Sequence, residues 1–411
     1  MTARGRAVLA VGVFCWIVAI VFGSAALYPV AAGLVLVVPF AVAWVRITLR
    51  QPRVSRRWRQ ESAVWGKEDL LERDDVWIQI ELEREPGIPL PGVVAHEHVG
   101  RLGERDVELR PHSRASHWGS YHLYNVARGR HRFSPVRLSI TDPFGLAEAR
   151  LTLEEQQALV VYPRLVELER VFFDGGSGPE HGRRLLLRRP VGFDLHSVRD
   201  YQQGESLRRV HWPSTARRGS LMVKELEDSP RDEVAVLLDG DPAGVTGSAP
   251  DSSFDVAVRA AGSILRAQVR SGRRCVLLLN TAGRETQVVS SVGPEWQRAL
   301  ELLAAAEPDA HGSAADLLRS ADAPAARSLE LVVVTSRVER TLGDRLLERV
   351  LTRRPVALVH VEAESFVGAA RRPVPELLRL QAAGVPIAVV RQRDDLASAL
   401  RGATAAEVAR A

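Results

Sequence analysis

A short apolar run in the second half of the sequence reads Glu233-Val234-Ala235-Val236-Leu237-Leu238-Asp239 and ends in a carboxylate. A run of this length between charged residues is typical of a strand that is buried on both faces of a sheet. A segment with apolar residues at helical spacing follows at 254–269, and a second buried run follows at 275–279. This alternation predicts a mostly parallel sheet that is covered by helices on both faces.

The same alternation continues toward the C-terminus and defines an α/β domain over residues 232–402. The further expected strands lie at 286–290, 329–335, 357–361 and 385–390, and the further expected helices lie at 294–306, 342–350, 375–383 and 394–401. Their order resembles the von Willebrand factor type A fold, which is a Rossmann-like arrangement.

The candidate metal ligands stand at the carboxyl ends of these strands, where open α/β sheets bind their ligands. Type A domains hold Mg²⁺ there with Asp-x-Ser-x-Ser after the first strand and with a Thr and an Asp from later loops. Asp239 matches the first ligand and Asp241 replaces the first Ser, whereas Ala243 has no ligand atom. Thr335 and Ser336 follow a later strand, with Ser336 where the Asp would stand. Asp239 and Asp241 therefore either hold a divalent ion with the help of water, or serve only to end a strand and begin a turn.

The most distinctive stretch of the chain covers residues 198–212 and reads Val-Arg-Asp-Tyr-Gln-Gln-Gly-Glu-Ser-Leu-Arg-Arg-Val-His-Trp. Its arginines and aromatic rings suit nucleic acid, a phosphate or carboxylate on a protein partner, or ion pairs within the fold. Acidic neighbours are dense enough to neutralise most of the arginines, which favours the last two interpretations and makes nucleic acid an unfavoured partner. The candidate partner-binding residues are Arg199, Tyr201, Gly204, Glu205, Arg208, Arg209, Trp212 and Arg217.

This stretch resembles the signature of the domain of unknown function 58 family, which is roughly Arg-x-Tyr-x-x-Gly-Asp-x-x-Arg-x-Ile-x-Trp, then Ala-Arg and a strand with Leu-x-Val. The matching positions are Arg199, Tyr201, Gly204, Arg208, Trp212, Ala216, Arg217, Leu221 and Val223. Glu205 replaces the usual Asp, and Val210 replaces the usual Ile. The upstream stretches Asp142-Pro143-Phe144-Gly145-Leu146 and Val160-Val161-Tyr162-Pro163 also resemble the family. The resemblance implies a membrane-anchored protein with a type A-like domain and, as its partner, a MoxR-type AAA+ ATPase.

Two apolar segments, 7–23 and 25–45, predict a transmembrane hairpin within residues 1–60. Tyr28 and Pro29 mark the turn between them. The flanking arginines are Arg4 and Arg6 before the hairpin and Arg46, Arg50, Arg53, Arg56, Arg57 and Arg59 after it. By the positive-inside rule they predict a multi-pass protein of the plasma membrane with both termini in the cytoplasm, and the second cluster is expected to lie on anionic lipid headgroups. A cleaved signal peptide is the weaker alternative, because a second span follows at once.

Between the hairpin and the signature, alternating residues such as Val76, Ile78, Ile80 and Leu82 predict half-buried strands and a small β-sandwich over residues 70–165. A Gly-rich break at 174–179 indicates a linker over 166–190, followed by the signature segment at 191–228. The sandwich carries no evident catalytic motif. Six histidines are expected there as exposed polar residues and not as metal ligands, namely His96, His98, His112, His117, His122 and His131.

Composition restricts the function further. The chain has 411 residues, a net charge of +5 and two cysteines, which are too few for a disulfide framework or a zinc site. The sequence contains no P-loop, no Gly-x-Ser-x-Gly and no His-Glu-x-x-His. We therefore expect a multidomain, non-catalytic adaptor without a cofactor, or with Mg²⁺ at most. The rival expectation is a divalent-metal-dependent enzyme or ligand binder that uses the incomplete metal site.

Overall fold

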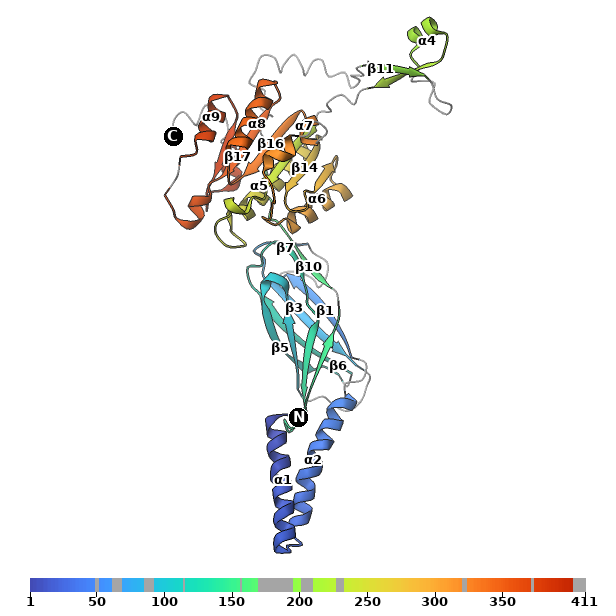
Figure 1. The fold of residues 1–411 in the computed structure, drawn as a ribbon, viewed down its shortest axis with the longest axis vertical. Helices are drawn as coiled ribbons and strands as arrows, with labels where there is room; N and C mark the ends of the chain where they lie inside the picture. The colour runs from blue at the N-terminus through green and yellow to red at the C-terminus, as the bar shows by residue number, and fades with distance from the viewer. Residues whose placement is uncertain are drawn as a thin grey trace. The chain divides into compact units, whose positions relative to one another are not determined.

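The structure is a computed structural model, and the chain divides into two compact units, Met1–Tyr162 and Pro163–Ala411 (Figure 1). The described residues are 1–48, 52–60, 69–84, 92–113, 115–155, 157–168, 195–200, 210–226, 233–319, 324–370 and 373–401.

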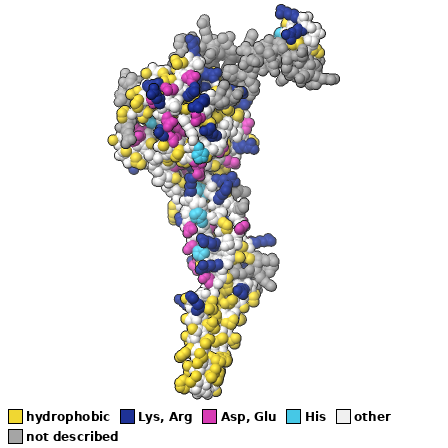
Figure 2. Space-filling model, viewed as in Figure 1, with side chains coloured by type: hydrophobic (Ala, Val, Ile, Leu, Met, Phe, Trp, Pro, Cys, Tyr) yellow, Lys and Arg dark blue, Asp and Glu magenta, His cyan; other side chains and the backbone are white. Residues whose placement is uncertain are grey.

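The first unit begins with a hairpin of two helices, α1 (Ala3–Phe22) and α2 (Leu27–Thr48). The helices touch closely, because a Cβ added at Gly12 would lie 3.0 Å from the Cβ of Leu34. Both helices are strongly apolar, yet only about a fifth of each is buried inside the protein. Hydrophobic side chains therefore cover the hairpin surface (Figure 2). Both helices are long and apolar enough to cross a membrane.

The turn of the hairpin lies earlier than the sequence suggested. Helix α1 ends at Phe22 and is followed by Gly23, whose φ of 61° is the left-handed conformation that favours glycine at a helix C-terminus. Tyr28 and Pro29 instead occupy the first turn of α2. Proline is tolerated there because the first N–H groups of a helix have no intrahelical acceptor.

The rest of the first unit is a β-sandwich with one antiparallel sheet of seven strands and a second sheet of three. The strands are β1 (Arg53–Gln60), β2 (Leu70–Leu71), β3 (Val76–Glu83), β4 (Gly92–His98), β5 (Glu104–Pro111), β6 (Ser116–Leu123), β7 (Gly129–Arg132), β8 (Val136–Thr141), β9 (Glu148–Leu153) and β10 (Ala158–Tyr162). The larger sheet has the order β1-β3-β6-β5-β4-β8-β9, and the smaller has the order β2-β10-β7. On β3 buried residues alternate with half-buried or exposed ones, as the period-two pattern predicted.

The hydrophobic core of the sandwich continues into the hairpin. Ala41 and Val45 of α2 lie in one buried cluster with Val54 of β1, Ile78 of β3 and Leu146. The last turns of α2 and the strands are therefore packed together as one body.

Four of the arginines that follow α2 lie in strand β1, namely Arg53, Arg56, Arg57 and Arg59. This corrects the prediction that the whole cluster lies on lipid headgroups. In β1, Val54 and Arg56 are buried whereas Arg53 and Arg57 are exposed, because successive strand residues point to opposite faces. Arg56 donates through Nε to the carboxylate of Glu97, which is also buried. Arg50 lies outside the described residues.

Two of the six histidines are buried, which also corrects the prediction. His117 and His131 point inward from β6 and β7, with exposed fractions of 2% and 4%. His131 Nε2 lies 2.8 Å from the carbonyl oxygen of Ala127, and burial lowers its pKa, so that this imidazole is held neutral.

The second unit contains the expected α/β body with a mixed sheet of six strands. The strands are β13 (Glu233–Asp239), β14 (Arg274–Asn280), β15 (Thr286–Val289), β16 (Glu330–Thr335), β17 (Val356–Val361) and β18 (Ile387–Val390). The order is β15-β14-β13-β16-β17-β18, and β15 is the antiparallel strand at one edge. The helices are α5 (Ser253–Arg270), α6 (Pro294–Ala305), α7 (Pro324–Arg327), α8 (Arg340–Leu351), α9 (Pro375–Ala382) and α10 (Leu396–Arg401).

Helices cover both faces of this sheet, so that the central strand is buried on each side. On β13, Val234 and Val236 pack in one core with residues of α5, α6 and α10. Ala235 and Leu237 pack on the opposite face with residues of α7, α8 and α9. The apolar run 233–239 has no polar face for this reason.

The signature segment contributes an antiparallel pair, β11 (Leu195–Asp200) and β12 (Met222–Leu226), and a short helix, α4 (Trp212–Arg218). Of the predicted linker 166–190, residues 169–190 lie outside the described residues. Its first residues belong to the α/β body: the backbone N–H of Val166 donates to Ser263 Oγ at 3.0 Å, and Val166 and Leu168 pack against the core around α5.

Candidate functional site

The strand order of the α/β unit creates one place where neighbouring strands lead away in opposite directions. From β13 the chain passes to β14 on one side, and it returns to β16 on the other side of β13. Asp239 ends β13 and Thr335 ends β16. In open α/β sheets such a switch point, at the carboxyl ends of the strands, is where ligands bind.

Asp239 is fixed at this switch point by two neutral donors. Its Oδ1 accepts a hydrogen bond from Asn280 Nδ2 at 2.8 Å, and its Oδ2 accepts one from Thr335 Oγ1 at 2.8 Å. Only 7% of Asp239 is exposed, and burial raises its pKa although both hydrogen bonds oppose the shift. The three side chains come from the ends of three adjacent strands, β13, β14 and β16.

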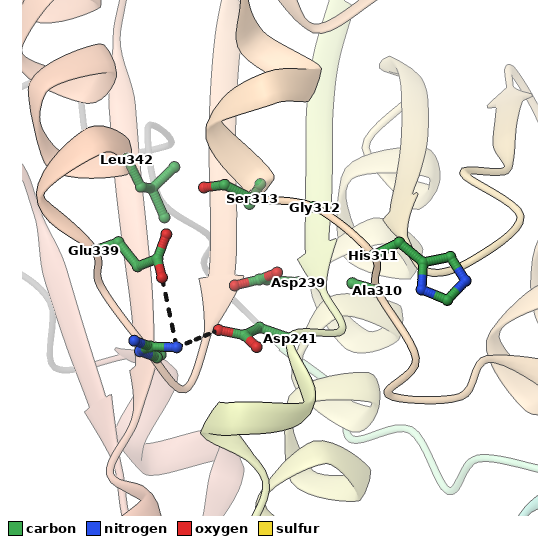
Figure 3. Close-up of a pocket in the computed structure, with 10 residues that line it drawn as sticks. Asp239, Asp241, Ala310, His311, Gly312, Ser313, Glu339 and Leu342 are labelled. Carbon is green, nitrogen blue, oxygen red and sulfur yellow. Dashed lines mark hydrogen bonds and ion pairs between the residues drawn. The ribbon is translucent and has the colours of Figure 1, made fainter.

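Asp241 is held by the backbone and by a cation. Its Oδ1 accepts from the N–H of Ala243 at 2.9 Å and so begins the short helix η3 (Pro242–Gly244). Its Oδ2 lies 3.1 Å from Arg337 Nη1, and the same guanidinium lies 3.5 Å from Glu339 Oε1 (Figure 3). Arg337 thus joins two carboxylates on the solvent side of Asp239.

A pocket of about 170 Å³ opens between these groups and the loop at 310–313. It is lined by Asp239, Asp241, Ala310, His311, Gly312, Ser313, Ala314, Arg337, Glu339 and Leu342 (Figure 3). Its volume is enough for a few water molecules or for the end of one polar side chain. Three carboxylates and one guanidinium line the pocket, so it favours a group that can donate hydrogen bonds.

The predicted metal ligands come together only in part. Asp239 and Thr335 are in direct contact, and Asp241 lies beside them in the pocket. Ser336 is half-buried, and a Cβ added at Gly244 would lie 3.2 Å from its Cβ. Over the described residues no group of three His, Cys, Asp or Glu side chains is placed to hold a metal ion.

The oxygen atoms of the predicted metal ligands are engaged by other groups in this structure. Both oxygens of Asp239 already accept hydrogen bonds, and the Thr335 hydroxyl lies 2.8 Å from both Asp239 Oδ2 and the carbonyl oxygen of Arg337. The Arg337 guanidinium occupies the ion-pairing oxygen of Asp241. Ca²⁺ and Mg²⁺ require several free oxygen ligands around one point.

Two of the predicted partner-binding residues lie on the surface of α4. Trp212, its first residue, is 64% exposed, and Arg217 is exposed in its last turn. Val210 and Met222 are buried on either side of the helix, and the N–H of Met222 donates to Thr215 Oγ1 at 3.0 Å. Arg199 lies in β11 opposite Val223. The other candidates lie outside the described residues, namely Tyr201, Gly204, Glu205, Arg208 and Arg209.

Sequence reasoning missed several residues of the pocket and of the strand end beside it. Asn280 is the polar end of a buried run, as Asp239 is, and this shared position was the available signal. Arg337 and Glu339 follow the β16 strand end by a few residues, but no spacing rule connects them to Asp241. His311 belongs to a loop whose approach to the strand ends is a tertiary contact.

A wider groove on the β-sandwich was also missed. It has a volume of about 490 Å³ and is lined by Arg57, Arg59, Trp77, Gln79, Glu81, His112, Trp118 and Ser120. Trp77 stacks on His122 with ring centroids 4.5 Å apart, and His112 meets Trp118 edge-on at 6.4 Å. The period-two pattern places these residues on the outer face, but only the strand register brings the two indoles to one groove.

The chain is similar to the "Uncharacterized protein YeaD" of Bacillus subtilis (strain 168), with 28% identity over 297 residues that cover 68% of this chain and 70% of that protein. A solved structure, that of a family 123 glycoside hydrolase from Clostridium perfringens, covers 82% of this chain and 72% of its own at 6% identity. Its TM-score of 0.13 is too low to support any argument. Residues 197–365, which include α4 and the switch-point pocket, match the family described as "Protein of unknown function DUF58", and this confirms the resemblance over that part of the chain.

Proposed function

We propose that this chain is a membrane-anchored, non-catalytic adaptor that binds a protein partner through the surface of α4. The observation that carries the proposal is the exposure of Trp212, at 64%, in a helix whose last turn holds the exposed Arg217 and Arg218. Trp and Arg are the residues most enriched among those that dominate binding energy at protein interfaces.

In this proposal the α/β unit is a type A-like domain whose ion site has been replaced by an internal ion pair. The strand order with its central β13, and the position of Asp239 at the first strand end, support that assignment. Arg337 supplies at Asp241 a positive charge that a metal ion would otherwise supply. The edge of the sheet then recognises a partner through hydrogen bonds and charge, without metal-mediated chemistry.

The partner that we propose is a MoxR-type AAA+ ATPase, as the family resemblance implies, in an ATP-driven assembly or maturation process at the membrane. The hairpin α1–α2 would hold the protein in the plasma membrane. Exposed arginines at its base, Arg4, Arg6 and Arg46, support an orientation with both termini in the cytoplasm, where such an ATPase has its ATP.

The test uses the full-length protein in lipid nanodiscs and a purified MoxR-type ATPase from the same organism, with the Kd measured by surface binding. Trp212→Ala is expected to raise the Kd about 30-fold or more, which corresponds to about 2 kcal/mol at a dominant contact. Arg217→Glu is expected to weaken binding as well. Leu351→Ala is the matched control, because Leu351 is an exposed apolar residue of the same unit outside the signature.

Equal losses in Trp212→Ala and Leu351→Ala would reject α4 as the contact surface. An unmodified protein that fails to bind the ATPase would reject that partner. The metal-dependent rival is tested by adding Mg²⁺ or Mn²⁺ and following the Tm, because an ion that binds only the folded protein raises it. We expect no rise; a rise that Asp239→Ala abolishes would overturn the non-catalytic assignment in favour of a metal site.

A further inference from the structure

One exposed turn of the β-sandwich is attached to the beginning of the transmembrane hairpin. It covers residues 142–147, between β8 and β9, and its tip is Phe144, a large apolar side chain that is 70% exposed. Leu146 and Ala147, at its other end, are buried in the sandwich core. The turn therefore presents one aromatic ring outward from a fixed base.

Asp142 makes the turn rigid. Its Oδ2 accepts from the N–H of Phe144 at 2.9 Å, and its Oδ1 accepts from the N–H of Ala147 at 2.5 Å. Asp142 is itself 4% exposed. Gly145 has a φ of 68°, which glycine adopts at no steric cost. Phe144 is thus held at a defined position and does not sample the surface as a free loop would.

The turn contacts the first residues of α1 through hydrogen bonds. The N–H of Thr2 donates to the carbonyl oxygen of Leu146 at 3.0 Å, and Thr2 Oγ1 donates to that of Gly145 at 2.6 Å. A Cβ at Gly5 would overlap the carbonyl oxygen of Leu146, so only glycine permits this approach. Thr2 also caps α1, because its Oγ1 accepts from the N–H of Gly5 at 3.1 Å.

These contacts set the level of Phe144 relative to a bilayer that the hairpin crosses. The apolar span begins at Ala7, five residues after Thr2, which is about 7.5 Å along a helix axis. The headgroup layer on each side of the hydrocarbon core is about 5–8 Å thick. Phe144, one residue from the carbonyl that binds Thr2, therefore lies at the depth of the headgroups.

We propose that Phe144 is an interfacial lipid-binding residue, which inserts into the headgroup layer of the leaflet where α1 begins. Aromatic rings favour this layer, and apolar area that is removed from water there stabilises the bound state. With the two helix ends that carry Arg4 and Arg46, Phe144 gives the first unit a third contact with the bilayer. Three contacts fix the tilt of the first unit relative to the bilayer, whereas two contacts leave it free to rotate about the line that joins them. The inference rests on the membrane anchorage of the proposed function.

The experiment places a nitroxide spin label at position 144 by Phe144→Cys, after Cys15→Ser and Cys275→Ser, in the full-length protein. The protein is reconstituted in vesicles of phosphatidylethanolamine and phosphatidylglycerol. Collision of the label with oxygen, which is concentrated in lipid, is compared with collision with a water-soluble nickel chelate. The label at 144 is expected to favour oxygen.

Tyr124→Cys is the matched control. Tyr124 is 72% exposed and follows Leu123, which pairs with Val76, and Val76 pairs with Gln60 at the far end of β1 from α2. The eight residues of β1 separate the two ends by about 23 Å at 3.3 Å per residue. The label at 124 is therefore expected to favour the nickel chelate.

Val11→Cys, in the exposed middle of α1, separates the two possible failures. Oxygen preference at 11 together with nickel preference at 144 would overturn the interfacial role of Phe144 and leave the anchorage intact. Nickel preference at both positions would overturn the anchorage itself, and the present inference with it.

Discussion

Glu97 of the first unit and Asp239 of the second are both buried carboxylates, and they have different kinds of partner. Glu97 in the sandwich is 2% exposed and contacts a charged Arg56 and the hydroxyl of Tyr121, which donates to its Oε2 at 2.5 Å. Asp239 in the α/β unit is 7% exposed and accepts hydrogen bonds from the neutral side chains of Asn280 and Thr335, while the Arg337 guanidinium pairs with Asp241.

The difference indicates that Glu97 serves to hold the sandwich together, whereas Asp239 is part of a site that a ligand can reach. Glu97 pairs within the core with Arg56, and neither side chain has any exposed area. Removing either partner therefore leaves the other charged group buried and out of contact with water. Asp239 lines a pocket, and burial raises its pKa. A carboxylate in that state responds to what enters the pocket, whereas Glu97 does not.

The largest effect is expected from breaking the sandwich pair. Arg56→Met leaves Glu97 buried and without its cation, and we expect a loss of about 3–5 kcal/mol in the free energy of unfolding. Denaturant unfolding of the full-length protein in detergent measures it. The double variant Arg56→Met, Glu97→Gln should regain much of the loss. A single variant that loses less than about 1 kcal/mol would show that the pair is not a buried ionic contact.

A smaller effect is expected from removing one neutral donor at the strand ends. Thr335→Val takes the hydrogen bond from Asp239 Oδ2 at a buried position, and we expect a loss of about 1–3 kcal/mol. Thr335→Ser keeps the hydroxyl and is the control, with most of the stability retained. If Val and Ser variants unfold at the same denaturant concentration, the hydroxyl contributes nothing and Asp239 is held in another way.

The pH dependence of stability gives a further test of the Asp239 site, because a raised pKa and a lowered pKa change the stability in opposite directions with pH. Because the folded protein raises the pKa of Asp239 above its ordinary 3.8, the protonated form favours folding, and its contribution to stability falls as the pH rises from about 4 through the folded pKa. Asp239→Asn should remove that decline. Its amide can still accept from Asn280, and the Thr335 hydroxyl can donate to the carbonyl of Arg337 instead.

Asp395 provides the control of opposite sign. Hydrogen bonds from Ser398 lower the pKa of Asp395, so its contribution to stability is present above the ordinary pKa and is lost as the pH falls. Asp395→Asn should therefore change the acid side of the profile. Profiles of Asp239→Asn and of the unmodified protein that run parallel from pH 4 upward would contradict the raised pKa of Asp239.

The smallest effect is expected from Arg337→Ala. The Arg337 side chain is 49% exposed, and ion pairs in such positions contribute about 0–1 kcal/mol because water screens them. The same type of substitution thus has very different costs at positions 56 and 337. A loss at 337 that approaches the loss at 56 would show that Arg337 is part of the core of the α/β unit and not a group that lines a pocket.

Much of the fold follows from residue periodicity. The apolar run 233–239 indicated a strand that is buried on both faces, because such a strand has no polar face. The alternating residues of β3 indicated a strand that is buried on one face only. Arg56 was wrongly predicted to face the lipid, because the prediction considered only the charge of the arginines. The period-two pattern of β1 places Arg56 on the buried face. The chain's two apolar helices were evident from length and composition alone.

The site was less accessible to such reasoning. Asp239 and Thr335 could be predicted as neighbours because parallel strands end at one edge of a sheet. The contact between Arg337 and Asp241 depends on how two loops leave that edge, and no local pattern records it. Trp212 was recognised as a binding candidate by residue type, but its exposure required the helix α4 and its placement between Val210 and Met222.

The core that joins α2 to the strands has a practical consequence for anyone who wishes to handle this protein in water. Cutting the chain after Thr48 would not free a ready-made soluble sandwich, because Ala41 and Val45 would leave Val54 and Leu146 with part of their packing gone. Buried apolar surface stabilises a fold by about 25 cal/mol per Å², so such a cut lowers the free energy of unfolding. It also exposes an apolar patch that promotes aggregation. Fragments of the first unit should therefore retain the last turns of α2, and their solubility will depend on a detergent or lipid that covers them.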